Sequence, residues 1–226
     1  QRIAQHWTQL NPNHIPAQFY LAHLALVNHE YPLAADTLDQ ILRFDPNAAL
    51  DRILAGIYPE NPEYRRQLLQ ALSRLETRDH PALLVLTAGL LAQDGQTEAA
   101  LSRVDRALQR RPDVTALITL KASILQQQGR LAEVAQWLEV QTRRLPDNKS
   151  LHLYRVRFLI KAGQPAQALE QLARMSRHWP RDGEISLLAG LICIDLKKPL
   201  EAERYLLQLL TLDEYVDQAY YSLGIN

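Results

Sequence analysis

The sequence predicts an all-α protein, an α-solenoid of about six and a half antiparallel helix pairs. Three observations lead to this fold class: residues typical of helices dominate, prolines recur at a fixed interval, and small residues recur at fixed places between them. The chain has 226 residues, 47% of them apolar, but only 8 glycines and 7% aromatic residues. Leucine, alanine, glutamine and arginine are abundant instead, and all four favour helices.

Five prolines share one context, in which an amphipathic run is followed by one or two residues and then the proline. They are Pro12, Pro46, Pro112, Pro146 and Pro180, at spacings of 34, 66, 34 and 34 residues. The interval of 66 residues holds two units, and Pro81 lies near its middle. Because proline stops a helix, each interval is expected to hold one complete pair of helices.

Small and large residues recur inside each unit. A glycine marks the turn between the two helices at Gly95, Gly129 and Gly163, where it can take the left-handed conformation that ends a helix. Small residues are expected where the helix axes approach, and large apolar residues where the second helix faces the core. The small residues are Ala22, Ala88, Ala122, Gly190 and Gly224, and the large ones are Leu38, Val104, Leu138, Leu172 and Leu206.

These spacings and residues resemble the tetratricopeptide repeat (TPR) family, whose unit is a helix–turn–helix of 34 residues. The resemblance covers the whole chain and is most specific from Pro81 to Asp213. It implies one right-handed solenoid from residue 1 to residue 226. Its full repeats lie near residues 15–48, 49–80, 81–114, 115–148, 149–182 and 183–216, with partial repeats at 1–14 and 217–226.

The second full repeat departs from this pattern. Its first helix, expected over Ala48–Ile57, is short, and the segment Pro59–Pro62 replaces the glycine turn before a second helix over Pro62–Thr77. We therefore expect a distorted repeat that bends the solenoid. The chain also opens in a second helix, over Arg2–Leu10, and closes inside a first helix, so we expect it to be part of a longer repeat protein.

Several function classes are excluded by composition and motifs. The 25 basic and 25 acidic residues balance, which disfavours a nucleic-acid partner, and no apolar run has the roughly 18 residues that membrane insertion needs. The histidines lack a metal-binding spacing, and Cys193 lies in an apolar run as a structural thiol. The sequence therefore predicts no catalytic residue, no cofactor, no metal and no enzyme activity.

The resemblance implies that the first helix of each pair lines a concave groove that binds a protein or peptide. The residues predicted to bind the partner are Ser123, Gln126, Gln127, Tyr154, Arg157, Lys161, Leu187 and Leu191. Further groove positions hold Phe19, His23, Leu26, Val85, Gln93, Thr119, Ser150, Glu184, Asp195 and Tyr221.

Two parts of this groove carry distinct predictions. Tyr154, Arg157 and Lys161 suit an acidic or carboxylate-bearing peptide, although a solvated helix face is an equal alternative. Leu187 and Leu191 form either an apolar partner surface or a contact beneath the next repeat.

A second resemblance concerns the place of action. The segments Ala49–Ala55 and Leu196–Tyr205 resemble Gram-negative periplasmic TPR lipoproteins, some of which bring a processing protease to cell-wall hydrolases. The resemblance implies a non-enzymatic adaptor in the periplasm, tethered to the outer membrane by a lipidated N-terminus outside this sequence, with the cytoplasm as the alternative location. The alternative function is a structural scaffold of a polysaccharide-export or secretion assembly. Such a scaffold could also associate with further copies of itself.

Overall fold

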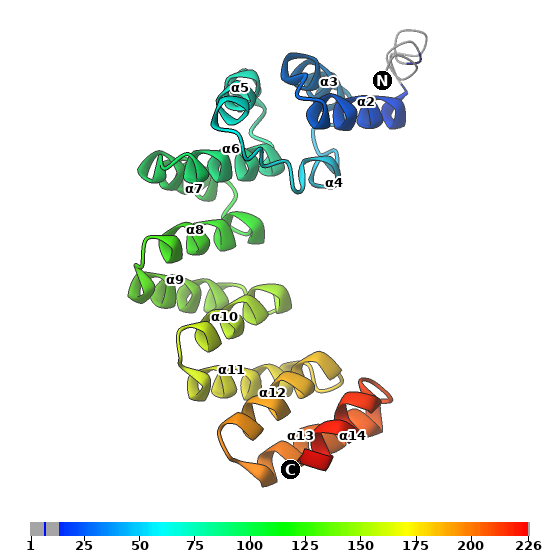
Figure 1. The fold of residues 1–226 in the computed structure, drawn as a ribbon, viewed down its shortest axis with the longest axis vertical. Helices are drawn as coiled ribbons and strands as arrows, with labels where there is room; N and C mark the ends of the chain where they lie inside the picture. The colour runs from blue at the N-terminus through cyan, green and yellow to red at the C-terminus, as the bar shows by residue number, and fades with distance from the viewer. Residues whose placement is uncertain (1–6, 8–13, 226) are drawn as a thin grey trace. The chain divides into compact units, whose positions relative to one another are not determined.

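The structure, a computed structural model, describes residue 7 and residues 14–225 (Figure 1). This part of the chain consists of helices and their connections and holds no strand, which confirms the all-α fold class. The chain divides into two compact units, Gln1–Gln128 and Gly129–Asn226. Within each unit, most helices pack against the helix before or after them in the chain.

The first unit holds the helices α2 to α8. The helices of its first and third pairs and the last helix begin and end within one residue of the bounds that the sequence predicts. The predicted bounds are Pro16–Asn28, Tyr31–Phe44, Pro81–Gln93, Thr97–Gln109 and Val114–Gln127. The bounds are α2 Ile15–Val27, α3 Tyr31–Phe44, α4 Asp51–Leu54, α5 Pro62–Ser73, α6 Pro81–Gln93, α7 Thr97–Arg110 and α8 Thr115–Gln127, with a 3-10 helix at Glu76–Arg78.

The second unit holds the helices α9 to α14. Their lengths of 13 or 14 residues, up to the final helix, match the regular repeat. The bounds are α9 Leu131–Arg144, α10 Lys149–Lys161, α11 Pro165–His178, α12 Gly183–Asp195, α13 Pro199–Leu212 and α14 Val216–Ile225.

The predicted turn glycines end their helices as expected. Gly95, Gly129 and Gly163 have φ angles of 76°, 72° and 70°, the left-handed region that glycine enters without steric cost. His29 and Lys197 occupy the equivalent turns of two other repeats with φ angles of 61° and 56°. Glycine is therefore favoured at this turn but not required.

Both helices of the second repeat are shorter than the sequence predicts. The helix expected over Ala48–Ile57 is reduced to α4, because Ala55 is extended and Gly56 is left-handed, with φ of 78°. The helix expected over Pro62–Thr77 ends at Ser73 and is followed by the 3-10 turn. The helix expected over Arg2–Leu10 lies, except for residue 7, outside the described residues.

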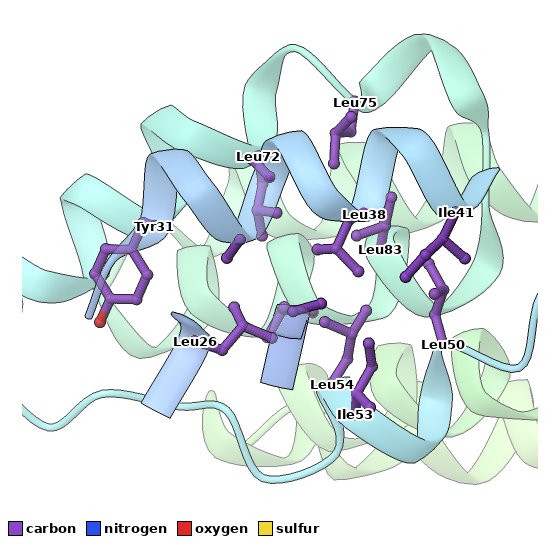
Figure 2. Packing of buried hydrophobic residues seen from close by; sticks show 14 of the residues in the cluster. Leu26, Tyr31, Leu38, Ile41, Leu50, Ile53, Leu54, Leu72, Leu75 and Leu83 are labelled. Carbon is purple, nitrogen blue, oxygen red and sulfur yellow. The ribbon is translucent and has the colours of Figure 1, made fainter. Parts of the chain in front are cut away.

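The core of the first unit runs along the inner faces of its helices (Figure 2). Leu26, Leu38, Leu72 and Leu83 meet there, each at most 4% exposed. Burying one such side chain stabilises the fold by roughly 1.5–3 kcal/mol.

The core of the second unit follows the predicted pattern of small and large residues. Leu138, Leu172 and Leu206 are fully buried, as predicted. Gly190 allows α12 to approach α13 closely, since a Cβ atom there would lie 2.8 Å from Leu206 Cδ2. The small residue predicted at this position therefore has a direct packing role.

Candidate functional site

A hollow of about 740 Å³ lies between α12 and α14 in the second unit. Its lining is mostly apolar, and two carboxylates lie on its rim. The lining residues are Leu187, Leu191, Ile194, Asp195, Asp217, Gln218, Tyr221 and Ser222.

The floor of this hollow is part of the core, and its walls are exposed. Leu187 and Ile194 pack against the buried cluster that contains Leu206 and Ala219. Leu191 is 41% exposed and Tyr221 is 74% exposed. Leu187 thus packs against the core and also lines the hollow, whereas Leu191 offers its side chain to solvent.

The rim of the hollow is acidic. Asp195 ends α12, and Asp217 lies in the first turn of α14, where the helix dipole also stabilises a carboxylate. Both side chains are exposed, and within residues 14–225 neither forms an ion pair. A partner that enters this hollow therefore meets two uncompensated negative charges.

The three residues predicted to hold an acidic peptide lie on α10. Arg157 donates from Nη2 to Glu184 Oε1 at 3.3 Å, although its side chain is 62% exposed. Lys161 is exposed at the end of the helix, and burial raises the pKa of the half-buried Tyr154. Glu184 of α12 therefore already compensates part of the charge of Arg157.

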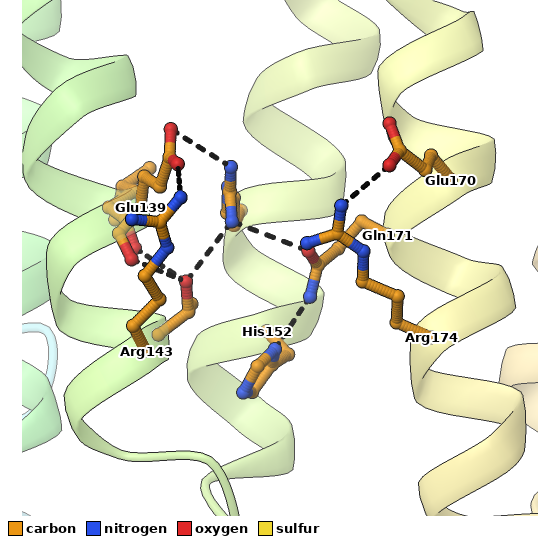
Figure 3. A network of polar contacts seen from close by, with 9 residues as sticks. Glu139, Arg143, His152, Glu170, Gln171 and Arg174 are labelled. Atoms are coloured by element: carbon orange, nitrogen blue, oxygen red, sulfur yellow. Dashed lines mark hydrogen bonds and ion pairs between the residues drawn. The ribbon is translucent and has the colours of Figure 1, made fainter.

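The opposite face of α10 is held by a polar network (Figure 3). Arg155 Nη1 donates to Thr142 Oγ1 at 3.2 Å and to Gln171 Oε1 at 3.3 Å, and its Nη2 lies 3.6 Å from Glu139 Oε2. Gln171 Nε2 lies 2.6 Å from His152 Nδ1. These contacts join α9, α10 and α11, and they fix the rotation of α10 and hence the direction of its exposed residues.

Burial affects the charged and titratable members of this network. It lowers the pKa of Arg155 below the usual arginine value and lowers the pKa of His152, since a buried charge loses its hydration. Sequence reasoning missed this network, although the spacing of His152 and Arg155 by three residues places them on one helix face.

The remaining predicted residues lie on α8 in the first unit. Ser123 and Gln126 are half-buried, and Gln127 is exposed at the end of the helix. Leu187 and Leu191 share one hollow, and Tyr154, Arg157 and Lys161 share one helix. A single groove through all eight residues stays a prediction.

The described residues contain neither a metal-binding cluster nor a membrane-spanning helix. No group of three or more histidine, cysteine, aspartate or glutamate residues in the described ranges is arranged to hold a metal ion. Among the helices of the described chain, none has the length and apolar character needed to cross a membrane. Cys193 is buried, and burial raises the pKa of its thiol, which disfavours the reactive thiolate.

Comparisons with known proteins agree with the repeat pattern. Two family models, both described as tetratricopeptide repeat, match residues 91–155 and 155–217, and together they span more than half of the chain. No curated protein matches the sequence.

Solved structures share the fold at low sequence identity. PilW, described as a widely conserved type IV pilus biogenesis factor, is 19% identical with a TM-score of 0.56, over 94% of this chain and 98% of PilW. MamA from Desulfovibrio magneticus RS-1 is 17% identical with a TM-score of 0.50, over 77% of this chain and 94% of MamA. At these identities the likeness shows the fold alone.

Proposed function

Because the chain belongs to the tetratricopeptide repeat family, we propose that it is a non-enzymatic adaptor that binds a partner protein in the hollow between α12 and α14. TPR repeats form scaffolds for protein–protein interaction, and TPR proteins are generally non-catalytic.

The observation that carries the proposal is the exposed apolar lining of this hollow. Leu191 and Tyr221 offer apolar surface to water at a concave site, and exposed apolar surface of this kind marks interaction sites. Aromatic side chains such as Tyr221 are enriched among the residues that dominate binding energy. The hollow therefore suits one or two apolar side chains of a partner.

The charge of the rim indicates the partner's flanking residues. Asp195 and Asp217 present negative charge, so lysine or arginine next to the inserted apolar residue complements the hollow. This adds a second class of partner to the acidic peptide that Tyr154, Arg157 and Lys161 suit. The acidic peptide would have to compete with Glu184 for Arg157.

A displayed library of random peptides, selected on the purified chain, tests both classes. We expect the enriched peptides to combine an apolar residue with lysine or arginine. Leu191→Asp is expected to reduce their binding about tenfold or more, because apolar contact is lost and the new carboxylate must be desolvated against the apolar side chain of the peptide. Its attraction for the lysine or arginine of the peptide offsets only part of this loss. Leu200→Asp is the matched control, because Leu200 is 81% exposed on α13 and does not line the hollow.

Enrichment of acidic peptides that lose binding with Tyr154→Ala plus Arg157→Glu would assign the partner to α10 and contradict the site between α12 and α14. Unchanged binding of the basic peptides to Leu191→Asp would contradict it as well. Circular dichroism of each variant checks that the helices are intact.

The place of action and the cellular partner form a separate proposal. Recruitment of a periplasmic protease or cell-wall hydrolase is supported by the resemblance of Ala49–Ala55 and Leu196–Tyr205 to periplasmic adaptors. Fractionation of cells that produce the full-length natural protein is expected to recover it with the outer membrane, and recovery in the cytoplasm would contradict the proposal. The alternative, a scaffold for polysaccharide export or secretion, predicts saccharide binding or oligomers in analytical ultracentrifugation.

A further inference from the structure

A second hollow, of about 570 Å³, lies in the first unit beside the distorted second repeat. Its apolar walls include Leu54 of α4, Tyr58 of the following segment and Val85 of α6. Its polar lining includes His80 and Arg111. Pockets that bind small molecules typically have volumes of about 300–1,000 Å³ and combine apolar walls with a few polar groups.

The hollow exists because the first helix of the second repeat is short. The first helices α2, α6 and α8 of this unit have 13 residues each, whereas α4 has 4. Helix α4 still contacts α2 and α6, but the chain then continues without helix until α5 begins at Pro62. The volume that a full helix would fill therefore stays open beside α6.

One wall of the hollow holds a histidine with an unused acceptor. His80 is 7% exposed, and its Nε2 lies 3.0 Å from the carbonyl oxygen of Ala48. Because a carbonyl only accepts, Nε2 carries the hydrogen and Nδ1 is an acceptor. Nδ1 is buried and has no hydrogen-bond partner among the described residues. Burial, aided by nearby Arg111, lowers the pKa of His80, so the ring is neutral near pH 7.

The hollow also holds a guanidinium without a counter-charge. Arg111 is half-buried and forms no ion pair with an acidic residue in the part of the chain that the structure describes. The preceding residue, Arg110, is more exposed and lies 3.1 Å from Asp79. Asp51 lines the hollow as well, but its side chain is exposed to water.

We propose that this hollow binds a small apolar carboxylate. The carboxylate would bind the guanidinium of Arg111, whose planar donors match carboxylate oxygens. The apolar body would lie against Leu54, Tyr58 and Val85. This site shares no residue with the hollow between α12 and α14.

Isothermal titration calorimetry of the whole chain with three related probes tests the proposal. 3-Phenyllactate has the carboxylate and the hydroxyl, 3-phenylpropionate lacks the hydroxyl, and 2-phenylethylamine replaces the carboxylate with a cation. We expect 3-phenyllactate and 3-phenylpropionate to bind with similar affinity through their carboxylates, and the amine not to bind. Arg111→Gln is expected to weaken the binding of 3-phenyllactate about tenfold or more, whereas the matched control Arg110→Gln is expected to leave the affinity for 3-phenyllactate unchanged.

A second variant keeps the proposal testable if Arg111→Gln alters the fold. Ala116→Phe adds a ring at an exposed lining position of α8 and is expected to block the hollow and abolish 3-phenyllactate binding. The proposal is overturned if neither carboxylate binds, if the amine binds through Asp51 more tightly than the acids, or if Arg111→Gln and Ala116→Phe bind 3-phenyllactate as the wild type does.

Discussion

The distorted second repeat and the regular repeats of the second unit differ in the length of the first helix and in how closely it packs against its neighbours. In the regular repeat, α12 has 13 residues and lies close to α13 through Gly190. In the second repeat, α4 has 4 residues, and a hollow of about 570 Å³ lies beside it. The intervals between prolines are nearly equal in the two regions, so the repeat length is preserved while the helix is not.

Hollows therefore arise in two different ways in this chain. Between α12 and α14, regular helices leave an exposed apolar surface between neighbouring first helices. Beside α4, the missing helical turns leave a volume that is partly enclosed by a buried histidine and apolar walls. The first arrangement suits the side chains of a protein partner, and the second suits a small molecule.

The largest expected difference concerns two buried leucines. Leu172→Ala, at a fully buried position of α11, is expected to lower the free energy of unfolding by about 3–5 kcal/mol, because the close-packed neighbours leave a cavity. Leu54→Ala beside α4 is expected to cost about 2 kcal/mol, since the lost volume merges with an existing hollow. Urea denaturation followed by circular dichroism measures both values, and a larger loss for Leu54→Ala would contradict the contrast.

A smaller difference is expected for two glycines inside helices. Gly190→Ala should lower the free energy of unfolding by about 1–3 kcal/mol, because the new methyl group would contact the fully buried Leu206. At Gly89 the new methyl group would lie 2.8 Å from the ring of Tyr58, whose outer end can move into the adjacent hollow. Gly89→Ala is therefore expected to be neutral or stabilising by up to about 1 kcal/mol, from the helix preference of alanine.

Thermal denaturation of the two glycine variants provides the measurement. Equal destabilisation of both would show that the segment at Tyr58 is packed as tightly as the contact between α12 and α13, which contradicts the contrast between the regions.

The smallest expected effect is a dependence on pH that both regions share. Burial is the main cause that lowers the pKa of His80 in the first unit and of His152 in the second. An unfolded histidine has a pKa of about 6.5, so below that pH the unfolded chain binds more protons than the folded one. The free energy of unfolding is therefore expected to fall as the pH drops below about 6.5, and to level off below the folded pKa values.

Urea denaturation between pH 5 and pH 8 checks this expectation. His80→Gln and His152→Gln are each expected to remove part of the pH dependence, with the wild type as reference. A wild-type stability that rises as the pH falls below 6.5 would contradict the assignment of both histidines as buried and neutral.

The regular part of the fold follows from the sequence because its signals are local. Prolines end the helices, and the turn glycines such as Gly129 take the left-handed conformation. The second repeat was recognised as irregular, but its first helix is shorter than predicted. Whether a segment next to Gly56 and Pro59 continues as a helix depends on tertiary packing, which residue spacing does not report.

The candidate sites were predictable to different degrees. Repeat positions predict Leu187 and Leu191 as groove residues, and both line one hollow. Repeat positions do not predict Asp217 as a groove residue, because its place beside α12 depends on how α14 packs. Arg110 and Arg111 both lie at the end of a helix, so the sequence alone does not distinguish them. Only their contacts in the fold do so.

The most direct test of the partner site is charge reversal at its rim. The dissociation constant of the best basic apolar peptide from the library is measured for the wild type and for Asp195→Lys plus Asp217→Lys, two exposed positions. We expect an affinity about tenfold lower for the double variant and a weaker dependence on salt, because two attractive charges become repulsive. An unchanged affinity with an unchanged salt dependence would contradict a partner site between α12 and α14.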